Sequence, residues 1–181
     1  LDLQGGAELP LVGSLACNDR FSRLTWGAKG AADGSLPYGL LAAGTANGSV
    51  QIVDPGRLIS RHDAPVVATI DSHSGPVRGL EFNPAVPELV ASGAAESEVF
   101  ITDLTNPSTP RVVSPGAKSP GPGADISCVA WNRRVTHILA STSHNGLSVV
   151  WDLKLKKPVI NFTNSANRGQ RNSVIAWNPE V

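Results

Sequence analysis

One segment of the sequence occurs three times at a constant interval. The copies begin at Leu40, Leu89 and Ile138, 49 residues apart, and read LLAAGTANGSVQIVDP, LVASGAAESEVFITDL and ILASTSHNGLSVVWDL. They align without gaps, and their closing aspartates keep the same interval (Asp54, Asp103 and Asp152). Spacing this strict is hard to obtain by chance, and it indicates one structural unit repeated in tandem.

Each unit has the pattern of four short β-strands. A strand that ends in an aromatic residue precedes each copy, and one more stands near the end of the chain (Trp26, Phe82, Trp131 and Trp177). A fourth strand follows in PVVATID from Pro65, in RVVS from Arg111 and in PVINFT from Pro158. Helical periodicity is absent, and 18 glycines and 14 prolines supply turns. Tandem four-stranded units of this size predict the blades of a β-propeller.

The turns and side-chain sizes fit such blades. Small residues in LVASGA predict a close approach between neighbouring blades. Asn47-Gly48 and Asn145-Gly146 predict two-residue hairpin turns, whereas Glu96-Ser97 requires a turn of another kind. Apolar residues point to both faces of the strand that contains Val99, Phe100 and Ile101, as expected for a sheet covered on both sides.

The unit resembles a WD repeat. The third copy ends in the name-giving pair Trp151-Asp152, while the other two end in Val53-Asp54 and Thr102-Asp103. The family's buried tetrad joins a loop histidine, a strand Ser or Thr, a turn aspartate and the tryptophan. Two positions of each later unit match it (His73 and Ser92; Ser141 and Trp151). Since no turn aspartate is evident in the middle unit and no histidine in the third, the resemblance implies incomplete networks.

A more specific resemblance covers residues 18–181. The segments NDRFSRLTWG, HSGPVRGLEFNP, ESEVFITDL, PGAK, DISCVAWN and VVWDL occur in an order that is similar to the amino-terminal propeller of the large subunit of the COPII outer coat. This resemblance implies a structural scaffold in vesicle transport from endoplasmic reticulum to Golgi, without enzymatic activity. It also implies coat-protein partners, especially the small propeller subunit of the outer coat, and a place at endoplasmic reticulum exit sites and COPII-coated vesicles. Membrane contact would be indirect, through the coat.

The expected architecture is all-β, an incomplete WD-repeat β-propeller over residues 1–181. Its approximate blades are residues 18–72, 73–124 and 125–170, with the start of the next at 171–181. An open stack of blades leaves an apolar face bare at each end. At ~25 cal/mol/Å², a face of about 500 Å² forgoes about 12 kcal/mol of burial, as much as holds a whole domain together. We therefore expect a fragment of a longer chain, whose faces dimerise or aggregate if it occurs alone.

Candidate catalytic residues have a structural interpretation that we prefer. Asp54, Asp103 and Asp152 each end a strand, where a carboxylate can accept backbone N–H bonds. Glu96 and Glu98 stand at a hairpin tip, where we expect a solvated loop rather than an acid–base pair. The histidines lack the spacing of a metal site (His62, His73, His137 and His144), and no phosphate or dinucleotide motif appears. We expect no cofactor.

Composition and loops restrict the possible partners. The 15 basic and 15 acidic residues balance, so no overall field attracts nucleic acid. Loop features remain open as modification or partner sites, although a solvated loop is preferred for each (Ser114 and Ser119 before prolines, Arg133-Arg134, Arg168 and Arg171). Cys17 and Cys128 are interpreted as free thiols. The alternative functions are an adaptor propeller, such as a ubiquitin-ligase substrate receptor, and more remotely an Asp–His hydrolase.

Overall fold

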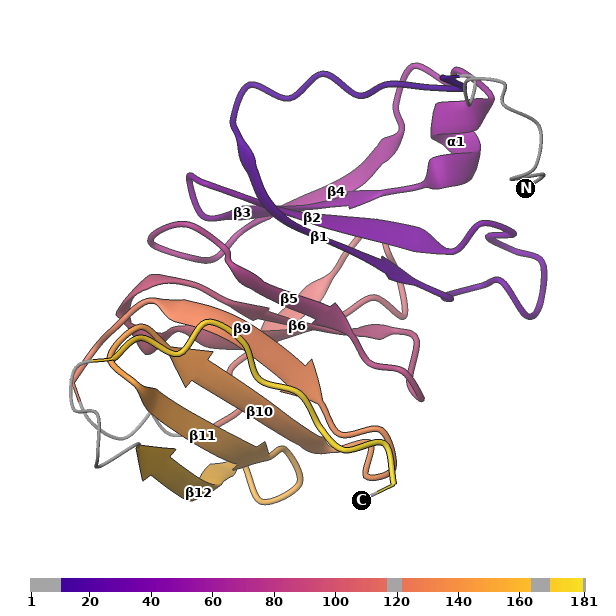
Figure 1. The fold of residues 1–181 in the computed structure, drawn as a ribbon. Helices are drawn as coiled ribbons and strands as arrows, with labels where there is room; N and C mark the ends of the chain where they lie inside the picture. The colour runs from indigo at the N-terminus through magenta and orange to yellow at the C-terminus, as the bar shows by residue number, and fades with distance from the viewer. Residues whose placement is uncertain (1–10, 117–121, 164–169, 181) are drawn as a thin grey trace, which may run out of the picture.

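The computed structural model describes residues 11–116, 122–163 and 170–180. Within them the chain forms three four-stranded sheets, as Figure 1 shows. The first contains β1 (Phe21–Gly27), β2 (Leu40–Thr45), β3 (Ser49–Val53) and β4 (Val66–Asp71). The second contains β5 (Gly79–Phe82), β6 (Leu89–Gly93), β7 (Val99–Asp103) and β8 (Arg111–Val113). The third contains β9 (Ile126–Trp131), β10 (Ile138–Ser143), β11 (Leu147–Asp152) and β12 (Lys157–Thr163).

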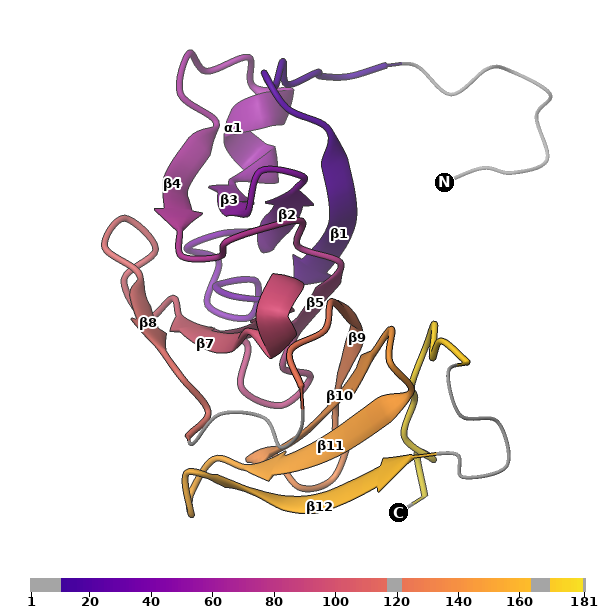
Figure 2. The ribbon, with the colours of Figure 1, turned by 90° about the vertical axis from the view of Figure 1, so that its left-hand side faces the viewer.

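Each sheet is an antiparallel meander in which every strand pairs with the next along the chain. The first strands of the sheets, β1, β5 and β9, lie side by side, so the sheets pack face to face in sequence order (Figure 2). The residues 170–180 run along β9, where a fourth first strand would lie. The expected all-β architecture of an incomplete propeller is confirmed.

Two apolar cores fill the spaces between the sheets. The first joins Val50 and Ile52 of β3 to Leu80 and Val90 of the second sheet. The second joins Ile101 of β7 to buried residues of the third sheet (Val129, Trp131, Leu139, Val149 and Trp151). The second sheet is therefore covered on both faces, which explains the apolar residues on both sides of its strands.

Glycines at repeat-equivalent positions let the sheets approach closely. A Cβ on Gly44 would lie 2.8 Å from Cβ of Val77, and a Cβ on Gly93 would lie 2.5 Å from Cγ2 of Ile126. Gly44 and Gly93 are 49 residues apart, as are Val77 and Ile126. The repeat therefore preserves the contacts between sheets as well as the strands themselves.

The hairpin turns differ from the expected two-residue type. Three residues separate β2 from β3 and β10 from β11, and only the glycine has positive φ (Gly48, 100°; Gly146, 84°). A three-residue loop that places glycine in the left-handed region is a common alternative. In the second sheet the connection is longer and passes through Glu96 (φ 52°) and Ser97 (φ 61°). The backbone N–H of Ser97 donates to the carbonyl of Ala124, which fastens this turn to the chain entering β9.

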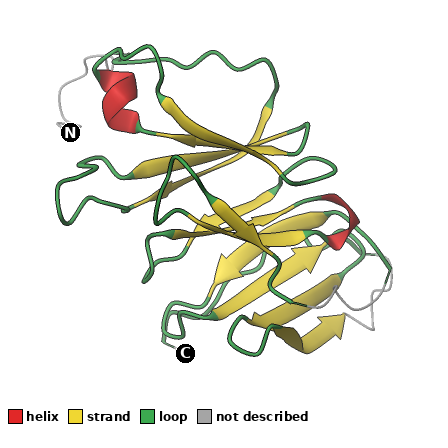
Figure 3. Cartoon of the chain, turned by 180° about the vertical axis from the view of Figure 1, so that it is seen from behind, coloured by secondary structure: helices red, strands yellow, loops and turns green. Residues whose placement is uncertain are grey.

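Two short helical segments interrupt the strands, although the sequence has no helical periodicity. The helix α1 (Pro55–Ile59) follows β3, and the 3₁₀ turn η1 (Ala95–Ser97) follows β6 (Figure 3). Asp54 caps α1 by accepting the backbone N–H groups of Gly56 and Arg57, and Pro55 occupies the first turn. One capped turn is enough to form a helix too short for a periodic pattern.

Candidate functional site

A buried histidine ties together two loops of the second sheet. His73 precedes β5, and its Nε2 lies 2.8 Å from Oγ of Ser92 on β6. Its Nδ1 lies 3.2 Å from Oε2 of Glu98, which also accepts the backbone N–H of Ser74 at 2.9 Å. The His73 ring rests 4.8 Å, centroid to centroid, from that of Phe100. Burial lowers the pKa of His73, and the hydrogen bond to Glu98 together with the charge of Glu98 opposes this effect. A neutral ring that donates from Nδ1 and accepts from Ser92 satisfies every partner.

Two expectations from the sequence are wrong at Glu98. Its side chain does not lie in a solvated loop, and the histidine network of the second sheet does contain a carboxylate. Its side chain is only 25% exposed, and it takes the place expected for a turn aspartate. The longer turn between β6 and β7 brings the glutamate to the histidine. Glu96, two residues earlier, is exposed. The two carboxylates therefore do not form a pair.

The third sheet contains the other two members of the WD-repeat tetrad, the strand serine and the tryptophan. The indole N–H of Trp151 donates to Oγ of Ser141 at 2.9 Å, and both residues are 1% exposed. Ser141 is the repeat equivalent of Ser92. Thr102, which stands at the tryptophan position of the second sheet, is buried at 3%. The structure thus brings together His73 with Ser92 and Ser141 with Trp151, in two separate sheets.

The three repeated aspartates close turns. Oδ1 of Asp54 accepts the N–H of Gly56. Oδ1 of Asp103 accepts the N–H and the hydroxyl of Thr105. Oδ1 of Asp152 accepts the N–H groups of Lys154 and Leu155. The hydrogen bonds from Thr105 lower the pKa of Asp103. Each carboxylate is occupied by the N–H groups of its own turn, which supports the structural interpretation of these aspartates.

Metal binding has no support in the described part of the chain. No group of three or more His, Cys, Asp or Glu residues there could hold a metal ion. His62 accepts the backbone N–H of Ala64 through Nδ1, and it belongs to an exposed turn. Cys17 and Cys128 are free thiols. No helix among these residues is long and apolar enough to cross a membrane.

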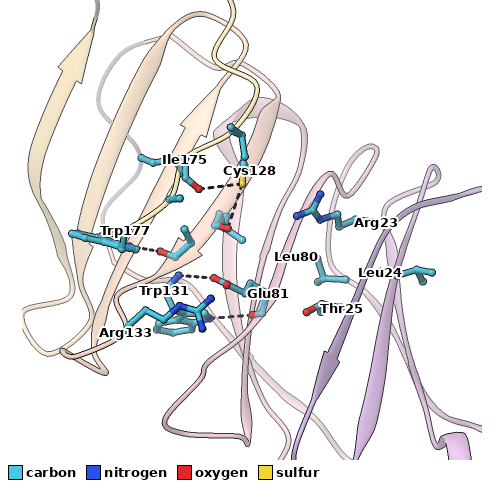
Figure 4. A pocket seen from close by; sticks show the side chains of 14 residues that line it. Arg23, Leu24, Thr25, Leu80, Glu81, Cys128, Trp131, Arg133, Ile175 and Trp177 are labelled. Atoms are coloured by element: carbon cyan, nitrogen blue, oxygen red, sulfur yellow. Dashed lines mark hydrogen bonds between the residues drawn. The ribbon is translucent and has the colours of Figure 1, made fainter. Parts of the chain in front are cut away.

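The first strands line a small hollow of about 240 Å³ with residues 174–177 (Figure 4). Two hydrogen bonds of Trp131 link the third sheet to the second. Its backbone N–H donates to the carboxylate of Glu81 at 2.6 Å, and its indole N–H donates to the carbonyl of Glu81 at 3.0 Å. Trp177 repeats the second contact by donating to the carbonyl of Ala130 at 2.8 Å. These bonds satisfy groups on strand edges that have no neighbour within their own sheet.

Burial raises the pKa of Glu81, while the Trp131 N–H and the charges of Arg133 and Arg23 lower it. The lining of the hollow contains one acidic group, Glu81, and no serine or histidine. The lining also contains the Cys128 thiol, which donates to the carbonyls of Val129 and Ile175. The bonds of Glu81 thus join the second sheet to the third, and that of Cys128 to Ile175 joins the third sheet to residues 174–177.

The loop features left open by the sequence lie apart from these networks. Arg134 pairs with Glu180 at 3.2 Å, whereas Arg133 and Arg171 are exposed. Oγ of Ser114 donates to the carbonyl of Gly116, two residues on. Ser119 and Arg168 lie outside the described residues. A solvated loop stays the prediction for the serines and for the arginines, with phosphorylation and an acidic partner as the alternatives.

Sequence reasoning missed two functional carboxylates in this scaffold. Glu98 could have been found from its place directly before β7, since that turn position supplies the carboxylate in WD repeats. Glu81 had a weaker signal, an acidic residue between two apolar ones in LEF. Its partner is the next sheet, which no local pattern reveals.

Comparison with known proteins identifies relatives that match most of the chain. It is 45% identical over 162 residues to "Protein transport protein Sec31A" of Gallus gallus, covering 90% of this chain. It is 43% identical over 174 residues to the Homo sapiens protein of that name, and 38% over 181 residues to "Protein transport protein SEC31" of Dictyostelium discoideum. The chain spans 13 or 14% of the length of these relatives. No family model matches it.

The solved structures that resemble the chain also come from the COPII coat. A chain of "COPII on membranes, outer coat vertex" superposes with a TM-score of 0.74 at 27% identity, covering 97% of this chain and 44% of that one. A chain of "The structure of the COPII coat assembled on membranes" gives the same score and covers 25% of that chain.

The stacked four-stranded sheets and their repeated cross-sheet contacts define a segment of a β-propeller. The sequence identity and the match to coat structures give the family. The chain belongs to the Sec31 family and corresponds to a segment of Sec31, the large subunit of the COPII outer coat. The relatives are named protein transport proteins, and the matched solved chains come from structures of the COPII coat.

Proposed function

We propose that the chain acts as a rigid, non-enzymatic part of the COPII outer coat in transport from the endoplasmic reticulum to the Golgi. The observation that carries this proposal is the identity of 38–45% to Sec31 proteins over 90% or more of the chain. Its superposition on chains of assembled coats supports the same function.

The contacts between sheets explain how such a segment can transmit force within a coat. The Arg78 guanidinium lies 2.6 Å from the carboxylate of Asp125, and the Lys29 ammonium lies 3.3 Å from the carboxylate of Glu88. Both pairs join one sheet to the next, as do the bonds of Trp131 to Glu81. Every buried side-chain nitrogen or oxygen of the described residues has a hydrogen-bond partner. These contacts support a rigid role for the segment.

The coat structures imply that the partners are other coat proteins. The specific partner that we propose is the small propeller subunit of the outer coat, bound in the context of the full-length protein. The proposed location is the cytosolic face of endoplasmic reticulum exit sites and COPII vesicles, with membrane contact only through the coat. These finer assignments follow from the family of the chain.

A chimera tests the proposal. The corresponding segment of human Sec31A is replaced by this chain, and the chimera is expressed in cells depleted of their own protein. We expect secretion of a reporter to recover and the chimera to colocalise with exit-site markers. A chimera that folds, yet stays diffuse and restores no transport, would contradict the proposal.

A matched pair of variants checks that folding decides the result. Trp151→Ala removes a side chain that is 1% exposed, whereas Leu155→Ala changes one that is 58% exposed. The first should abolish rescue and the second should preserve it. Equal rescue by both would show that an ordered third sheet is unnecessary for transport.

A further inference from the structure

Exposed cations gather at one edge of the third sheet, where its strands end. Five of the 15 lysine and arginine residues of the chain lie there, and we call them the basic edge (Arg133, Arg134, Lys154, Lys156 and Lys157). All five are exposed. The matching connections of the second sheet, residues 83–88 and 104–110, contain no cation, and Arg111 is the counterpart of Lys157. The charge is therefore particular to the third sheet.

Two connections form the basic edge, and the fold joins them. The backbone N–H of Leu153 donates to the carbonyl of His137 at 3.0 Å, and Figure 1 shows the connection from β9 to β10 and the turn from β11 to β12 at the same edge. Four strands span about 14 Å, which an extended peptide covers with about four or five residues. Neighbouring sheets stack on the faces of the third sheet, so this edge stays accessible within a longer stack.

The lysine turn has a fixed backbone. Oδ1 of Asp152 accepts the N–H groups of Lys154 and Leu155. Lys156 adopts a φ of 52°, and its carbonyl lies so close to Gly116 of the preceding connection that a Cβ there would clash. A turn that is already ordered loses less conformational entropy when a partner binds.

Arg134 shows which groups the basic edge accepts. Its guanidinium lies 3.2 Å from the carboxylate of Glu180, and its Nε donates to the carbonyl of Pro179 at 3.4 Å. One cation thus holds a carboxylate and a peptide carbonyl of the same segment. The three lysines form no ion pair with any acidic residue in the part of the chain that the structure describes. They can receive further carboxylates.

We propose that the basic edge binds an acidic peptide segment of a partner protein, with the three lysines paired to its carboxylates. Charge complementarity carries this inference, as in the recognition of acidic motifs by basic clusters. Arg133 and Arg134 alone fit a solvated loop, but the lysine turn that the fold places beside them favours an acidic partner. The carboxylate and peptide carbonyl that Arg134 holds favour a peptide over a lipid headgroup.

Fluorescence anisotropy tests the proposal with the purified chimera, in which the chain lies within full-length human Sec31A. The probe is a labelled peptide of alternating glutamate and serine. We expect binding that weakens as the salt concentration rises. Lys154→Glu combined with Lys156→Glu should weaken binding by about tenfold or more, because two attractive pairs become repulsive. A peptide with glutamine in place of glutamate should not bind.

A second double variant separates this edge from a general effect of charge. Arg20→Glu combined with Arg61→Glu makes the same change in net charge on exposed residues of the first-sheet region, and it should preserve binding. Equal weakening by the two double variants, equal binding of the glutamine peptide, or no binding at all would refute the proposal. Circular dichroism verifies that each variant is folded.

Vesicles of phosphatidylserine and phosphatidylcholine test the lipid alternative. We expect no binding of the chimera that depends on Lys154 and Lys156. Vesicle binding that the lysine variant loses, without binding of the peptide, would assign the edge to a membrane and overturn the proposal. Rescue of transport is a separate measurement, so a failure here would leave the coat assignment unaffected.

Discussion

The second and third sheets hold the same strand serine in opposite ways. In the second sheet Ser92 is bound by His73, which comes from the loop before β5 and is anchored by Glu98. In the third sheet Ser141 is bound by Trp151, from the adjacent strand β11. The first arrangement ties two loops to the sheet, and the second fixes a large apolar side chain in the core between sheets. Either half of the WD-repeat network is enough to occupy the buried hydroxyl.

The largest expected effect is on the tryptophan side of this comparison. Trp151→Ala removes a fully buried ring and leaves the hydroxyl of Ser141 without its donor. We expect the free energy of unfolding to fall by about 3–5 kcal/mol, measured by urea denaturation. Trp151→Phe loses the N–H but fills most of the space, and should cost clearly less. If the two variants were equally unstable, the hydrogen bond rather than the ring would dominate.

Removal of the shared serine gives the next effect. Ser92→Ala and Ser141→Ala should each lower the unfolding free energy by about 1–3 kcal/mol, because each leaves a buried partner unsatisfied. We expect similar losses, because both partner side chains are buried: Trp151 is 1% exposed and the side chain of His73 is 0% exposed. The measurement is again urea denaturation. A clearly larger loss for one variant would show that the two sheets depend on this serine to different extents.

Two neighbouring glutamates sharpen the comparison within the second sheet. Glu98→Gln weakens the hydrogen bonds to His73 and to the N–H of Ser74, and should cost about 1 kcal/mol. Glu96→Gln alters an exposed side chain of the same turn and should have almost no effect. Thermal denaturation of both variants measures the difference. Equal midpoints would show that Glu98 is as free as its neighbour.

The smallest effect is a pH dependence confined to the second sheet. Burial lowers the pKa of His73 from its ordinary value of 6.5, so the unfolded chain binds this proton more readily than the folded chain. The stabilising contribution of neutral His73 is therefore complete above pH 6.5 and is lost as pH falls toward the folded pKa. The slope for one proton is at most about 1.4 kcal/mol per pH unit.

This pH dependence is measured by urea denaturation between about pH 5 and 8, a range that brackets the ordinary histidine pKa. His73→Gln should flatten the curve, and His62→Gln, in an exposed turn, should leave it unchanged. An unchanged slope in His73→Gln would assign the effect to another group.

Much of the fold could be predicted because the repeated unit is recognisable from residues that lie close together in the sequence. Alternating apolar residues, turn glycines and the interval of 49 residues predict four strands per unit and their antiparallel order. The turn length could not be predicted, because Asn-Gly fits two-residue and three-residue loops, and the fold selects the loop in which Gly48 alone has positive φ. The short helix α1 depends on one cap, Asp54, which produces no periodicity.

The sequence by itself determined the repeated unit, the recurring aromatic position and the pairing of Ser141 with Trp151 inside one hairpin, because these contacts join residues close along the chain. Only the tertiary structure decided that Glu98 completes the His73 network and that Glu81 receives the N–H of Trp131. These partners lie 25 and 50 residues apart. They meet because the sheets stack, and the stacking leaves no trace in the local pattern of either residue.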